Sequence, residues 1–143
     1  MIGASSRARR PLLALAVAAG ITVATAPTFA HHSRAMFDMP KNITYLGIVE
    51  KYRWQNPHSQ IVVRVRPGAA DRSTVGTWTV EASAIGIMTY CGWTPRTYKP
   101  GDPITVVAHP SMDGSHLVLL FYAIKADGTR LCRAAHQYDG EKE

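Results

Sequence analysis

The feature that most constrains the fold is the spacing of apolar residues, which changes once along the chain. Between residues 42 and 82, apolar and polar side chains alternate in three runs, of which "QIVVRVR" (60–66) is the clearest. A period of two predicts β-strands that bury one face. Gly47 lies inside the longest of these runs, 42–54, and predicts a bulge or a sharp coil of that strand.

The segment 83–92 has the spacing of a helix instead. It begins with Ser83, a predicted N-cap, and ends with Gly92, a predicted C-terminal stop. The apolar positions predicted to share one helix face are Ala84, Ile87, Met88 and Cys91. Strand patterns then return at 103–110 and 116–126, and a turn leads into a short final strand.

This order of three strands, one helix and two strands predicts a mainly β fold. The expected architecture is a small OB-like five-stranded barrel with one helix between strands 3 and 4. A small β-sandwich is the alternative. We expect the barrel domain to cover residues 42–134, with an N-terminal arm at 31–41 and a flexible tail at 135–143. The length suits one domain with one small core.

Residues 1–30 have the pattern of a signal peptide. Three arginines precede an apolar stretch that is too short, and too rich in Ala, Gly and Thr, for a membrane span. The small-x-small sequence "TFA" predicts cleavage between Ala30 and His31. The expected product is a periplasmic or secreted protein with no membrane span. Both general and twin-arginine export stay open, because "RRPLL" resembles a twin-arginine signal only loosely.

Cleavage would also change the charge of the protein. Removing the three arginines of the signal lowers the formal net charge from +6 to +3. So modest an excess argues against nucleic-acid binding, which needs a strongly basic face. With nucleic acid excluded, the expected partners are a metal ion, a small ligand or another periplasmic protein.

Cys91 and Cys132 are the only two cysteines, and both lie in the part of the chain expected to be exported. An oxidising compartment makes a disulfide the default interpretation of such a pair. It would close a loop of about 42 residues. The rival interpretation is a pair of soft metal ligands.

Four motifs resemble those of the DUF6152 family, small exported bacterial proteins of unknown function. They are "HHSRAMFD" (31–38), "WQNPHSQI" (54–61), "GW" with a following "YKPGD" (98–102), and "VVAHPSMDGS" (106–115). The resemblance spans roughly residues 30–130. Arg34 departs from it, since the family more often has an aromatic or apolar residue there, and the two cysteines are not part of the family pattern. The resemblance implies an exported, compact β domain with histidines at motif positions, and it supplies no reaction.

Four histidines stand at these motif positions: His31, His32, His58 and His109. If cleavage makes His31 the N-terminus, its α-amine and Nδ1 can chelate one metal ion together. The amine has an ordinary pKa of about 7.7–8, so a metal displaces its proton near neutral pH. One imidazole from elsewhere completes a T-shaped site of three nitrogens, and nitrogen-rich tetragonal sites suit Cu(II).

His58 and His109 are the imidazoles expected to complete that site. Each is next to a proline at a predicted strand end, where an OB barrel gathers its binding loops. We therefore predict a copper site of His31, His58 and His109, with His32 as an alternative ligand. The competing interpretation is that these histidines hydrogen-bond backbone groups in turns and bind no metal.

Weaker ligand candidates are Met36, Met39, Met112 and His116. Thioethers favour Cu(I), which would suit a protein that passes copper between redox states. Methionine is also common filler in cores, and that interpretation competes directly.

Enzyme signatures are scarce, and no catalytic residue is predicted. The chain has no H-E-x-x-H, G-x-S-x-G, phosphate-binding loop or C-x-x-C. Four aspartates at predicted turns are interpreted as turn formers: Asp38, Asp102, Asp113 and Asp127. Three functions stay open: a copper carrier or sequestering protein, a metal-free OB-type module that binds a protein or small ligand, and, with least support, a copper-dependent oxidative enzyme.

Overall fold

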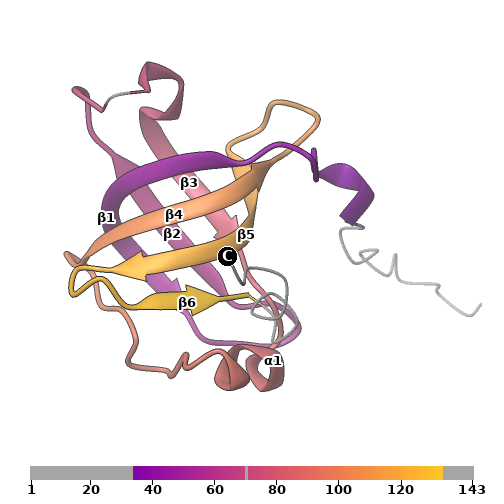
Figure 1. Ribbon diagram of the computed structural model, residues 1–143, viewed down its shortest axis with the longest axis vertical. Helices are drawn as coiled ribbons and strands as arrows, with labels where there is room; N and C mark the ends of the chain where they lie inside the picture. The colour runs from indigo at the N-terminus through magenta and orange to yellow at the C-terminus, as the bar shows by residue number, and fades with distance from the viewer. Residues whose placement is uncertain (1–33, 70, 134–143) are drawn as a thin grey trace, which may run out of the picture. The chain divides into compact units, whose positions relative to one another are not determined.

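The computed structural model describes residues 34–69 and 71–133. Its strands curve into a closed barrel of five, with a sixth short strand on the outside (Figure 1). The strands are β1 (Ile43–Arg53), β2 (Gln60–Val65), β3 (Gly76–Glu81), β4 (Pro103–Pro110), β5 (Leu117–Lys125) and β6 (Arg130–Cys132). The helix α1 (Ile85–Tyr90) follows β3, and two 3-10 turns are η1 (Arg34–Met36) and η2 (Arg72–Thr74).

The strand pairing is that of the predicted OB-like barrel. β1 pairs with β2 on one side and with β4 on the other, and β2 pairs with β3, all antiparallel. β4 pairs with β5, and a short parallel pairing of β3 with β5 closes the ring. The predicted mainly β barrel is therefore confirmed, and the sandwich alternative is wrong. β6 adds to the free edge of β5.

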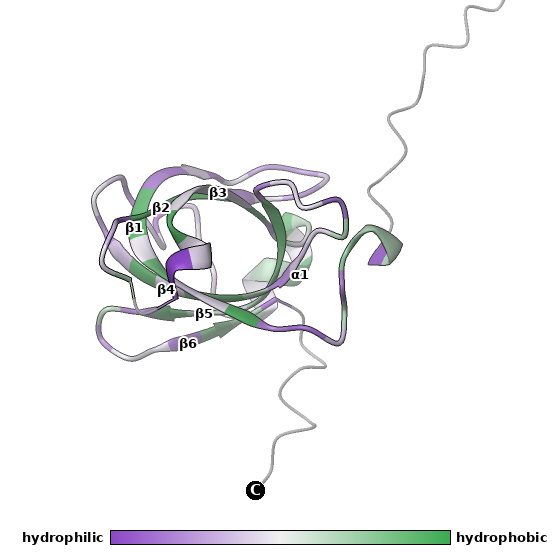
Figure 2. Ribbon diagram, turned by 90° about the horizontal axis from the view of Figure 1, so that it is seen from above, coloured by the Kyte–Doolittle hydropathy of each residue, from purple (hydrophilic) through white to green (hydrophobic). Residues whose placement is uncertain are grey.

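Figure 2 shows the ring of strands from above, and the buried apolar side chains of these strands form the core. In β2, the alternation predicted from the sequence places Ile61, Val63 and Val65 inward, each at most 1% exposed. The largest fully buried side chains include Trp93, Tyr45, Ile61, Met88 and Leu120. Burial of this apolar surface is the main free-energy gain of the fold.

Gly47 lets two strands approach more closely than any other residue would. A Cβ built at this position would lie 2.5 Å from Val63 Cγ1 and 2.6 Å from the backbone oxygen of Arg64. The irregularity in the β1–β2 register falls between Val49 and Lys51. Gly47 therefore allows β1 to pack closely against β2. The bulge predicted at Gly47 lies a few residues later in β1.

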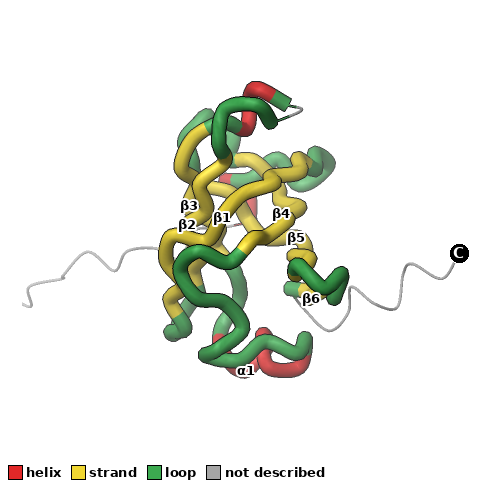
Figure 3. Tube along the Cα trace, turned by 90° about the vertical axis from the view of Figure 1, so that its left-hand side faces the viewer, coloured by secondary structure: helices red, strands yellow, loops and turns green. Residues whose placement is uncertain are grey.

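The helix α1 sits at one end of the barrel, and η2 sits at the other (Figure 3). The prediction of Ser83 as the N-cap of α1 is wrong: the cap residue is Ala84, which makes no side-chain cap bond. The amide of Ile85 instead donates to Asn56 Oδ1 at 3.0 Å, so the loop after β1 caps the helix. Gly92 ends the helix with φ +81°, as predicted. Ile87, predicted to share a helix face with Met88 and Cys91, is 45% exposed, whereas those two residues are buried.

A disulfide joins the end of α1 to β6. Cys91 and Cys132 are bonded, and both are buried. Beside them Trp93 is 1% exposed, and its indole N–H donates to the Cys132 carbonyl at 2.7 Å. This corner therefore combines a cross-link, a large buried side chain and a satisfied carbonyl.

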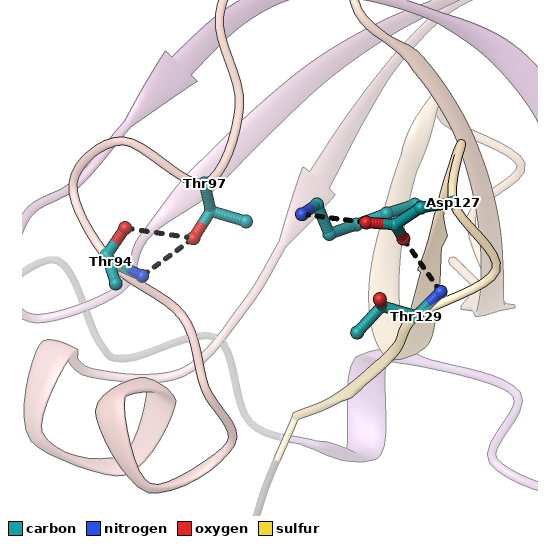
Figure 4. A network of polar contacts seen from close by, with 5 residues as sticks. Thr94, Thr97, Asp127 and Thr129 are labelled. Atoms are coloured by element: carbon teal, nitrogen blue, oxygen red, sulfur yellow. Dashed lines mark hydrogen bonds and ion pairs between the residues drawn. The ribbon is translucent and has the colours of Figure 1, made fainter.

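Short side-chain bonds order the connecting loops, as the close view shows for two of them (Figure 4). Asp127 Oδ1 accepts from the Thr129 amide at 2.9 Å in the β5–β6 turn, and the Thr94 amide donates to Thr97 Oγ1 at 2.7 Å. Hydrogen bonds from the Ser111 hydroxyl and from Ser115 lower the pKa of Asp113 to about 2. Aspartates at these turns do form turns, as predicted.

Among residues 34–69 and 71–133, no helix has the length and apolar character needed to cross a bilayer.

Candidate functional site

A close contact between the His58 imidazole and the Glu81 carboxylate is the centre of the candidate site. His58 Nδ1 lies 2.8 Å from Glu81 Oε1, and the two side chains are 31% and 5% exposed. A carboxylate so deeply buried needs a partner, because an unpaired buried charge is costly. Here the partner is an imidazole, whose Nδ1 is thereby fixed as the nitrogen facing the carboxylate.

Backbone pairing explains why His58 meets Glu81. In the β2–β3 register Gln60 lies opposite Glu81. Two bonds continue this pairing beyond the strands: the Ser59 amide donates to the Ser83 carbonyl, and the Ala82 amide donates to the Ser59 carbonyl. Alternation along β3 predicted its inward residues correctly and gave no signal for Glu81, whose burial depends on the loop that carries His58.

The N-terminal arm is fixed to β4 close to this pair. Phe37 is 3% exposed and forms an isolated β-bridge with Ser111. The Asp38 amide donates to the Pro110 carbonyl at 2.9 Å, and the Met112 amide donates to the Met36 carbonyl at 2.9 Å. The arm is therefore held to the domain at Met36, Phe37 and Asp38, and Phe37 is its buried anchor.

The arm, the His58 loop, α1 and the strand ends line a solvent-open cavity of about 240 Å³. Its wall contains Arg34, Phe37, Pro57, His58, Glu81, Ala82, Ser83, Ala84, Ile87, Leu119 and Arg133. Two arginines, one imidazole and one carboxylate thus surround a small space.

The two arginines are close enough to affect titration nearby. Burial lowers the pKa of Arg133, and the charge of Arg34 lowers it further. Burial is also the main cause that lowers the pKa of His109, with smaller contributions from Arg133 and Arg34. The electrostatic environment of the cavity is therefore positive, with Glu81 as the carboxylate in its wall.

His109 lies in β4 and is 4% exposed. Its Nδ1 is 3.0 Å from the carbonyl oxygen of Lys41, and its ring packs against Phe121 at 5.3 Å between centroids. Its lowered pKa favours the neutral imidazole, which is the form that binds metals. His58 and His109 thus share one property, an Nδ1 held by an oxygen atom.

The weaker candidates lie in different surroundings. His116 stacks on Trp78 at 4.2 Å between ring centroids, and its Nδ1 lies 3.2 Å from the Thr77 carbonyl, near the start of β3, whereas Glu81 ends that strand. Met36 and Met112 are 36% and 71% exposed. Met39 is half-buried beyond η1.

His31 and His32 lie outside the described residues, as do the predicted signal segment and tail. Within the described ranges, no three side chains of His, Cys, Asp or Glu are grouped so that they could hold a metal ion. His58 and Glu81 form a pair and not a group of three.

A comparison with protein families decides what this chain is related to. The family model of DUF6152, a family of unknown function, matches residues 18–119. The chain belongs to DUF6152. The resemblance seen in the motifs is thereby confirmed. Neither the curated proteins nor the solved structures gave a significant match.

Described parts of three motifs of this DUF6152 chain lie near the docked arm, but His109 is not in the wall of the His58 cavity. The first motif supplies Arg34 and Phe37 to the cavity wall, and the second supplies His58. The last carries His109 and the Ser111 bridge that holds the arm. Segments distant in sequence therefore meet where the arm docks.

Proposed function

We propose that this DUF6152 protein is an exported copper-binding protein whose Cu(II) site forms at the His58 cavity. One observation carries the proposal: Arg34 and His58 line the same cavity, and His31 precedes Arg34 by only three residues. An extended chain covers at most about 3.5 Å per residue, so a segment of three residues spans no more than about 10 Å.

The ligands proposed are the α-amine and Nδ1 of His31 and the Nε2 of His58. Three nitrogens in this arrangement suit Cu(II), which prefers tetragonal nitrogen sites. Glu81 would orient the His58 ring, as carboxylates do behind metal-bound histidines. His109 and His32 stand as alternative ligands for the remaining position.

The test is a Cu(II) titration, followed by EPR, of protein exported with its native signal. Intact mass should first show a chain that starts at His31. We then expect one tight, nitrogen-rich tetragonal site. His58→Ala should weaken it strongly, and Glu81→Gln should weaken it about 10–100-fold, as loss of a metal ligand's hydrogen-bond partner does.

Two further variants make this test specific. One extra alanine placed ahead of His31 moves the amine away from the ring and should abolish the tight site. His116→Ala removes an imidazole near the start of β3 and should leave the titration unchanged. Thermal melts establish that each variant is folded. A chain that starts elsewhere, or an affinity no tighter than that of free histidine, would overturn the copper proposal.

A second candidate function is binding of a small anionic ligand in the same cavity without a metal. The observation that favours it is the pair of guanidinium groups, Arg34 and Arg133, whose mutual repulsion contributes to the lowered pKa of Arg133. An anion between them would relieve that repulsion. Arginine forks also bind carboxylate and phosphate groups with defined geometry.

The two candidates predict opposite effects of one substitution. If the cavity binds Cu(II), Arg34→Ala should strengthen Cu(II) binding, because it removes a nearby positive charge. If it binds an anion, the same variant should weaken calorimetric binding of inorganic phosphate, and added salt should do so too. Arg96→Ala, in the exposed loop before β4, is the matched control.

A further inference from the structure

A second cavity lies toward the other end of the strands. Its volume is about 680 Å³, within the range of sites for small molecules. Leu119, near the start of β5, lines the His58 cavity, whereas Ile124 and Lys125, at the end of β5, line this one. The two sites are therefore separate, and ligand binding at the second is independent of the copper proposal.

The apolar part of this cavity comes from the outer wall of the barrel. Leu46 of β1 lies opposite Thr105 of β4, which lies opposite Ile124 of β5, so these three share a face. Leu46 is 59% exposed, although it stands within a strand. In the adjoining row, Ile48 lies opposite Pro103. An apolar surface shared by three strands and left open to solvent indicates a binding site.

The charged part of the cavity comes from the strand ends. Three cations line it: Arg64 in β2, Arg66 in the loop that follows β2, and Lys125 in β5. The lining contains one acid, Asp71. Arg64 is bonded to Glu50 and Lys125 to Asp127, and both pairs are partly exposed and therefore weak. Arg66 forms none of the ion pairs found among the described residues, so it is the cation that remains for a ligand.

We propose that this outer-wall cavity binds a single-chain carboxylate amphiphile, a free fatty acid. The hydrocarbon chain would lie on Leu46, Ile48 and Ile124, and the carboxylate would meet Arg66 and Lys125. The observation that selects this ligand class is charge complementarity: the apolar surface adjoins cations, so an anionic head group is favoured over a cationic one.

The test is calorimetric titration of the whole mature protein with decanoate, kept below its micelle concentration. We expect saturable binding of one decanoate. Leu46→Asp should weaken decanoate binding about tenfold or more, because the substitution places a charge where the hydrocarbon chain of decanoate packs. Arg66→Glu should weaken decanoate about fivefold and strengthen decyltrimethylammonium, whose head group is positive.

Tyr90→Asp is the matched control, since Tyr90 is 85% exposed on α1 and lines neither of the two cavities. It should bind decanoate as the wild type does. Leu46 points into solvent, so Leu46→Asp should fold, and a thermal melt checks this. The proposal is overturned if decanoate does not bind, if Leu46→Asp and Tyr90→Asp behave alike, or if the protein binds anionic phosphatidylglycerol vesicles and not monomeric decanoate.

Discussion

Replacing both Cys91 and Cys132 with alanine should lower the free energy of unfolding by about 4 kcal/mol. The disulfide joins residues 41 positions apart, so it closes a long loop and lowers the conformational entropy of the unfolded chain. Without the disulfide the unfolded chain regains that entropy and the folded state is less stable. In a domain of this size the loss corresponds to a fall in melting temperature on the order of 15 °C. Denaturant unfolding of oxidised protein, reduced protein and the double variant measures the effect.

Reduced wild-type protein serves as the control for that variant. Both lack the cross-link and keep the same packing around Trp93, so their stabilities should agree to within about 1 kcal/mol. A loss below about 1 kcal/mol in both would contradict the prediction. It would mean that the packed corner alone restrains β6.

Replacing Trp93 with alanine should cost about 3–5 kcal/mol, the range for truncating a fully buried aromatic side chain. Trp93 is 1% exposed, and the substitution also leaves the Cys132 carbonyl without its indole donor. Trp93→Phe separates the two contributions. It keeps most of the ring and removes the N–H, so about 1–3 kcal/mol should be lost.

Trp54→Ala is the matched control, because Trp54 is only partly buried against the core. It should destabilise the domain clearly less than Trp93→Ala does. Equal losses at the two positions, measured by denaturant unfolding, would show that the corner beside the disulfide has no special role in stability.

The barrel could be predicted from the sequence because its signals are local. Alternation in β2 depends only on which residues follow one another, and so does the positive φ of Gly92 at the end of α1. The helix cap could not be predicted. Asn56 accepts the hydrogen bond of the Ile85 amide, which lies 29 residues later in the sequence. The role of Gly47 could not be predicted either, because it depends on the close approach of Arg64 in the next strand.

The candidate site was predictable only in part, for the same physical reason. The motif histidines His58 and His109 were visible as residue types beside prolines at strand ends. Their orientation was not, since it depends on Glu81 in β3 and on the carbonyl of Lys41 in the arm. The arginines Arg34 and Arg133 come from opposite ends of the domain, so only the folded structure reveals the positive character of the cavity.

The parallel pairing of β3 with β5 also determines when the chain can fold. Ring closure joins residues 79–81 to residues 117–119, and β1 must pair with β4 across the whole helical insertion. A chain emerging from the ribosome therefore lacks the contacts of the closed barrel until nearly all of it has been made. Such long-range pairing makes folding slow. Because β5 is synthesised late, the polypeptide would stay unfolded, and thus able to pass through a narrow channel, for most of its synthesis.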